Sequence, residues 1–153
     1  MQTLLLRMIV VCAVALSIPS LRAETPTRVD EICKTINGVA LEGYDPVTYF
    51  TLGKPAVGVK EITTTWRGAT WRFVSAENRD LFVSNPDKYA PQYGGYCAWG
   101  VSQGMLMTGD PECWEMVSGK LYLTQSAELC NTFKKDAFAY IFRANANWPG
   151  ILG

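Results

Sequence analysis

Short segments with the composition typical of β-strands predict two β-hairpins along the chain. The segments are rich in threonine, valine, leucine or aromatic side chains, and a glycine-containing turn separates the members of each pair. The paired segments are 63–66 with 70–74 and 113–117 with 120–124, and the turns are Arg67-Gly68-Ala69 and Ser118-Gly119.

Hydrophobic residues spaced by three or four positions predict an amphipathic helix in the C-terminal part of the chain. We expect this helix to begin after an N-cap at Ser126 and to end before Trp148-Pro149-Gly150. Its apolar positions are Leu129, Phe133, Ala137, Ile141 and Ala144. Ser75 predicts the N-cap of a shorter helix that reaches Val83, and residues 87–89 predict one further turn.

Together these elements predict a small single α+β domain with two β-hairpins, short helices and a C-terminal amphipathic helix. No internal repeat, low-complexity tract or linker is visible in the sequence. We expect the domain to cover residues 37–149, after a lead-in segment at residues 24–36 that begins with loose polar residues.

The N-terminus predicts a secretory signal peptide over residues 1–23. Arg7 precedes an apolar run at residues 8–18, and Pro19 and the small residue Ala23 follow it. The run is shorter than the roughly 20 residues that span a bilayer. We therefore expect a periplasmic or secreted protein, with an uncleaved membrane anchor as the alternative.

Charge and composition exclude several functions. Loss of residues 1–23 removes two arginines and leaves 12 basic residues against the 14 acidic residues of the chain. No cluster of lysine or arginine stands out, so we expect neither nucleic acid nor, after signal cleavage, a membrane surface as partner. The sequence contains no histidine, which excludes histidine-based acid–base catalysis. A non-enzymatic role is the better expectation.

The densest candidate site is the segment of residues 89–104, Y-A-P-Q-Y-G-G-Y-C-A-W-G-V-S-Q-G. It contains three tyrosines, one tryptophan, four glycines and Cys97. Glycine permits close backbone approach, whereas aromatic rings require rigid, buried surroundings. Their combination around one thiol indicates a shaped site.

Five motifs together resemble those of exported bacterial YHS-domain proteins, relatives of the metal-associated TRASH domains. They are G-Y-D-P-V-T-Y-F at 43–50, the segment 71–82, N-P-D-K-Y-A-P-Q-Y-G-G-Y-C-A at 85–98, G-K-L-Y-L at 119–123 and A-N-W-P at 146–149. The resemblance covers roughly residues 37–149. It implies a small binding module for which a reaction is not defined.

The resemblance also implies where heavy-metal ligands stand in the wider family. Its cysteines correspond to Thr48, Val74 and Asn78 of this chain, and none of these is a thiol. We therefore expect no metal site there, with Val74 in the core and Asn78 on a helix face. Cys97, within the motif of the exported branch, remains.

Three interpretations of Cys97 stay open. It is a buried structural residue packed by Tyr93, Tyr96 and Trp99, or a disulfide partner of Cys33, or a soft-metal or redox thiol. In the metal interpretation, Met105 and Met107 alternate along an extended segment and complete a set suited to a soft metal such as copper in the Cu(I) state.

Asp45 has two interpretations as well. Because Pro46 follows it, it fits an N-cap with proline at the first helical position. Alternatively its carboxylate lines a ligand pocket. The predicted ligand-binding residues are Tyr44, Asp45, Tyr93, Tyr96, Cys97 and Trp99.

Cys113 and Cys130 depart from what the resemblance implies at their positions. Two additional thiols in an oxidising compartment are expected to form a disulfide, and a helix that folds back across its own hairpin brings them close. Pairing of Cys33 with either remains an alternative. Three functions stay open for the chain: a small-ligand or soft-metal binding module, a structural or partner-binding module, and a thiol redox protein.

Overall fold

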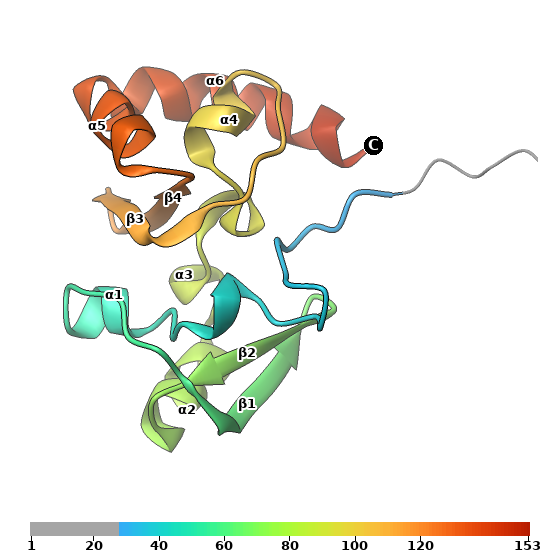
Figure 1. The fold of residues 1–153 in the computed structure, drawn as a ribbon, viewed down its shortest axis with the longest axis vertical. Helices are drawn as coiled ribbons and strands as arrows, with labels where there is room; N and C mark the ends of the chain where they lie inside the picture. Colours follow the sequence, from blue (N-terminus) through green and yellow to red (C-terminus); the bar gives the residue numbers. More distant parts are fainter. Residues whose placement is uncertain (1–27) are drawn as a thin grey trace, which may run out of the picture.

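The computed structural model describes residues 28–153, and the predicted α+β class is confirmed (Figure 1). The predicted signal peptide lies outside the described residues. Among residues 28–153, no helix has the length and apolar character needed to cross a bilayer. Both predicted hairpins are present, and each is a separate two-stranded antiparallel sheet.

The fold consists of two successive units with the same order of elements. The first unit contains the 3₁₀ turn η1 (Leu41–Gly43), α1 (Thr48–Thr51), β1 (Val59–Trp66), β2 (Ala69–Phe73), α2 (Ala76–Ser84) and α3 (Pro86–Tyr89). The second contains the 3₁₀ turn η2 (Gln92–Gly95), α4 (Ala98–Ser102), β3 (Asp110–Val117), β4 (Lys120–Thr124), α5 (Ala127–Lys135) and α6 (Ala137–Leu152). No internal repeat is visible in the sequence, but the backbone repeats the same order of elements twice.

Equivalent positions of the two units lie 51 residues apart from the hairpin onward, as Val59 and Asp110 show. Both hairpin turns have two residues with positive φ, and in each turn the second is a glycine. The N-cap side chains of α2 and α5 are Ser75 and Ser126, as predicted. The two units have the same kinds of turn and N-cap residues but few identical residues at equivalent positions, so the repeat is not visible in the sequence.

The same equivalence holds ahead of each hairpin. Asp45 N donates to Ala56 O at 2.9 Å in the first unit, and Cys97 N donates to Met107 O at 2.8 Å in the second. Asp45 and Cys97 therefore occupy corresponding places, each just after a 3₁₀ turn and just before a short helix.

The C-terminal helix differs from the prediction in two ways. It is divided at Asp136, where the extended φ of −153° ends α5 and the carboxylate caps α6 by accepting from Ala139 N. It also continues through Pro149 to Leu152. The extension is stabilised because Trp148 and Ile151 pack against the core of the second unit.

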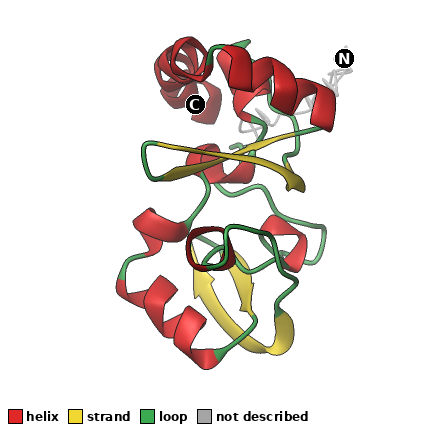
Figure 2. Ribbon diagram, turned by 90° about the vertical axis from the view of Figure 1, so that its left-hand side faces the viewer, coloured by secondary structure: helices red, strands yellow, loops and turns green. Residues whose placement is uncertain are grey.

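Strand β4 lies between the two cores. Leu121 and Leu123 pack with the first core, which contains Trp71 and Phe73, while Tyr122 packs with the second. Figure 2 shows the resulting arrangement, with one hairpin above the other and α5 and α6 on the outer side of the second.

The lead-in segment is bound to the domain, at least over its described part. Ile32 is buried, and Cys33 N donates to Gly94 O at 2.9 Å. Tyr96 Oη donates to Asp30 O at 3.1 Å. Residues 30–33 therefore pack on η2, which corrects the expected loose lead-in for this stretch.

We predict that Gly58→Ala destabilises the fold by about 1–3 kcal/mol, because overpacking beside rigid backbone has costs of that size. A Cβ at Gly58 would lie 2.6 Å from both Arg72 C and Phe73 N. Gly150→Ala is the matched control, since nothing lies within 4 Å of its Cβ and it stands in a helix. Urea unfolding measures both, and equal midpoints for the two variants would contradict the prediction.

Candidate functional site

The Asp45 carboxylate is fully buried and joins three elements of the first unit. Its Oδ1 accepts from Val47 N at 2.8 Å, ahead of α1. Its Oδ2 accepts from Val74 N at 2.9 Å, at the end of β2, and from Asn78 Nδ2 at 2.7 Å, on α2. The helix α1 begins at Thr48, two residues later than an N-cap at Asp45 predicts. The carboxylate still caps the turn that leads into it.

The three positions that the sequence resemblance aligns with metal-binding thiols all hydrogen-bond to Asp45. Thr48 Oγ1 donates to Asp45 O at 2.9 Å, and both Val74 and Asn78 donate to the side chain. Within residues 28–153, no group of three or more acidic, cysteine or histidine residues is arranged to hold a metal ion. These positions thus form a hydrogen-bonded cluster around Asp45. The expectation that Val74 packs in the core is wrong, because its side chain is 37% exposed.

Cys97 is the second unit's counterpart of Asp45 and has a similar local role. Its side chain is fully buried, and Sγ accepts from Gly100 N at 3.5 Å to cap α4. The structure thus gives burial and a capping bond for Cys97, and its packing by Tyr93, Tyr96 and Trp99 stays a prediction.

The two predicted thioether ligands lie around the same short helix. Met107 Sδ lies against Gly100, where a Cβ would come within 2.9 Å of the sulfur. Met105 N donates to Gly100 O at 2.9 Å, and its side chain is exposed. The set of Cys97, Met105 and Met107 stays a prediction, with its thiol sealed inside the protein.

Of the predicted ligand-binding residues, Tyr93 belongs to the second core and Tyr96 and Trp99 pack against it, whereas Tyr44 lies apart from them. Tyr44 Oη donates to Glu112 Oε1 at 2.9 Å on the surface, and this bond raises the pKa of the phenol. Trp99 packs against the second core. Tyr96 lies against Trp148, with 6.0 Å between the ring centroids. Only Tyr93 of the six lines the cavity described next.

A cavity of about 340 Å³ opens between the two units and the lead-in segment, and we call it the junction cavity. The hairpin turn of the first unit, α3, η2, the start of β4 and α6 all contribute to its wall. Its lining residues are Glu31, Ile32, Trp66, Arg67, Asp87, Ala90, Pro91, Gln92, Tyr93, Gly94, Lys120, Asn145 and Trp148.

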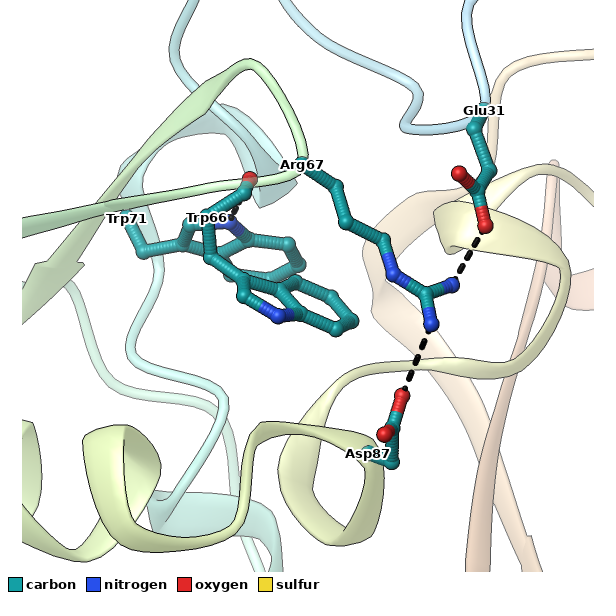
Figure 3. A network of polar contacts seen from close by, with 5 residues as sticks. All are labelled: Glu31, Trp66, Arg67, Trp71 and Asp87. Atoms are coloured by element: carbon teal, nitrogen blue, oxygen red, sulfur yellow. Dashed lines mark hydrogen bonds and ion pairs between the residues drawn. The ribbon is translucent and has the colours of Figure 1, made fainter.

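Arg67 organises one wall of the junction cavity (Figure 3). Its guanidinium pairs with Glu31 of the lead-in and, at 3.1 Å, with Asp87 of α3. It also lies over the Trp66 ring, 4.4 Å from the centroid. Because Arg67 is partly exposed, these ion pairs contribute little stability, and their effect is to fix the shape of the wall.

Tyr93 and Lys120 form other parts of the lining. Tyr93 Oη hydrogen-bonds to Asn145 Oδ1 at 2.9 Å, and burial raises the pKa of this phenol strongly. The Tyr93 and Trp148 rings meet at 5.7 Å in an edge-to-face arrangement. Lys120, in contrast to Arg67, forms no ion pair with another residue in the described part of the chain.

Sequence reasoning missed most of this lining. Trp66, Arg67 and Lys120 stand at hairpin ends, where their spacing carries no chemical pattern, and Trp148 entered only as part of a motif. The available signal was the Trp66-Arg67 pair at the predicted turn, because a tryptophan beside an arginine can form a cation–π contact, which the structure shows.

Four cysteines at 33, 97, 113 and 130 are free thiols in this structure. Cys33 lines a cavity with Thr108 and Gly109, and burial raises the pKa of its thiol. Cys113 and Cys130 line another cavity together. Disulfide formation between the latter two stays a prediction.

Comparison of the chain with family models, curated proteins and solved structures gives no match. The relationship to YHS proteins therefore stays an expectation based on the sequence motifs.

We predict that Asp45→Ala destabilises the protein by about 3 kcal/mol or more, since each buried donor without a partner costs about 1–3 kcal/mol. The substitution leaves Val47 N, Val74 N and Asn78 Nδ2 without their acceptor.

The control for this prediction is Asp80→Ala. The Asp80 side chain is 68% exposed and pairs with Arg79, so its loss should cost less than about 1 kcal/mol. Denaturant unfolding measures both variants, and a loss at Asp45 no larger than at Asp80 would refute the assigned role.

Proposed function

We propose that this chain is an exported binding module of the YHS type that takes a small ligand in the junction cavity. The observation that carries the proposal is the lining itself, where the rings of Trp66, Tyr93 and Trp148 share one hollow with Lys120. Small-ligand sites combine apolar and aromatic walls with a few convergent polar groups, and they favour the boundaries between structural units.

The charges of the lining indicate the chemistry of the ligand. Arg67 is occupied by Glu31 and Asp87, which leaves Lys120 as the basic group available to a ligand. The Gln92 and Asn145 side chains add neutral polar groups. The best fit is a flat, mainly apolar molecule that carries one anionic group.

Binding is a better proposal than catalysis for this cavity. Both lining carboxylates are bound to Arg67, and the sequence contains no histidine to transfer a proton. The aromatic walls and Lys120, unpaired among the described residues, suit a site that binds a ligand and releases it without chemical change.

We predict that the protein binds 8-anilinonaphthalene-1-sulfonate, a flat aromatic anion, at one saturable site. Lys120→Gln should weaken this binding by up to about fivefold, which corresponds to the ~1 kcal/mol of an exposed charge contact. Probe fluorescence and isothermal calorimetry give the affinity and the stoichiometry.

Two controls locate the probe. Lys135→Gln removes an equally exposed charge from α5 and should leave the affinity unchanged. A Phe138→Ser, Phe142→Ser double variant removes two rings of α6 that are 72% and 78% exposed and offer a competing surface. Binding that survives Lys120→Gln unchanged, or that disappears in the phenylalanine variant, would argue against the junction cavity.

Export is the second part of the proposal, and its support is the charged start and apolar run of residues 7–18. We predict that the protein recovered from its own host begins near Glu24. N-terminal sequencing measures this directly. A chain that retains Met1 and is extracted only with membranes would exclude cleavage.

A further inference from the structure

A second cavity, of about 520 Å³, lies between β3 and α5 and is separate from the junction cavity. We call it the thiol cavity because Cys113 and Cys130 both line it. The remaining lining residues are Glu112, Trp114, Glu115, Met116, Ala127, Asn131 and Lys134.

The two thiols lie on elements that face each other across the thiol cavity. Cys113 and Glu115 of β3 both line this cavity. Cys130 and Lys134 are four positions apart on α5, so they share one face of the helix. Glu115 and Lys134 already meet in an ion pair with 3.0 Å between Oε2 and Nζ. The cysteines line the same cavity beside this ion pair, one on each of the two elements.

Direct contacts agree with this placement. Cys130 Sγ donates to Trp114 O at 3.6 Å, and Trp114 follows Cys113 in β3. Cys113 Sγ donates to Asp110 Oδ2 at 3.5 Å. Burial and the Asp110 carboxylate raise the pKa of Cys113 to about 11, with a further contribution from the neighbouring Cys130. The dithiol form is thus a satisfied state of the fold, with an acceptor for each proton.

We propose that Cys113 and Cys130 are a reversible redox site that exchanges with the disulfides of small thiols. In the reaction, the thiolate of one cysteine attacks a sulfur of a small disulfide, forms a mixed disulfide and releases one small thiolate. The second cysteine then displaces the other small thiol and closes the bond between β3 and α5. The two cysteines are oxidised, the small disulfide is reduced to two thiols, and the cysteine protons pass to these products.

Three features favour a reversible site over a permanent cross-link. Both cysteines line the thiol cavity, where the half-buried Cys113 is the more exposed of the two, so a small disulfide can approach the pair from this side. Both thiols have hydrogen-bond partners without the bond, so the fold does not require it. The bond would also tie a nine-residue helix to its own hairpin, a local connection that leaves the two cores in place.

The test equilibrates the purified full chain, without air, in graded mixtures of reduced and oxidised glutathione. Acid quenching, alkylation and peptide mapping then report each cysteine separately. We expect Cys113 and Cys130 to lose alkylation together, with a linked peptide that disappears again when reduced glutathione is added. At equilibrium the ratio of the linked form to the dithiol form should be proportional to the concentration of oxidised glutathione divided by the square of that of reduced glutathione, as an intramolecular bond requires.

Variants make the test specific. Cys113→Ser should prevent the linked form and leave Cys130 only able to form a mixed disulfide, whereas Cys33→Ser should leave the transition unchanged. Circular dichroism confirms that each variant is folded. The proposal is overturned by a bond that the reducing mixtures never open, by single modification of either thiol while the other stays free, or by linkage of either to Cys33.

Discussion

The two units depend on strand β4, which is buried on both faces and contributes side chains to both cores. Successive side chains of a strand point to opposite sides, so Leu121 and Leu123 enter the first core while Tyr122 enters the second. Each such side chain contributes about 1.5–3 kcal/mol when buried. Separating the units would expose both faces at once, and this is why two small repeats form one cooperative body.

The junction cavity follows from the place where the two units stop being alike. The first unit ends in the single-turn helix α3, whereas the corresponding helix α6 continues over 16 residues. The extra turns of α6 bring Asn145 and Trp148 back over η2, where they meet the hairpin turn of the first unit. The junction cavity therefore exists because α6 is longer than α3, and neither unit could form it alone.

The sequence predicted what local chemistry determines. Glycine at each hairpin turn and serine at each N-cap act within a few residues, so both hairpins and the starts of α2 and α5 were correct. Val74 was misplaced because strand alternation outweighs its apolar character: Ala69, Trp71 and Phe73 face inward, so the next residue faces solvent. The junction cavity depends on contacts between distant segments, which no local pattern records.

The internal repeat also explains why the conspicuous thiol is an unpromising place for chemistry. Asp45 and Cys97 occupy one backbone position in the two units, and that position is a buried cap ahead of a short helix in both. A carboxylate there accepts from three donors, whereas the thiol sulfur there is a weak acceptor and receives one hydrogen bond, from Gly100 N. In the second unit this residue therefore makes fewer hydrogen bonds. The turn η2 has a separate contact with the lead-in segment, in which Cys33 N donates to Gly94 O. The thiols that line the thiol cavity are instead the half-buried Cys113 and the buried Cys130, between β3 and α5, where the first unit has Ile62 and Arg79 at the corresponding places.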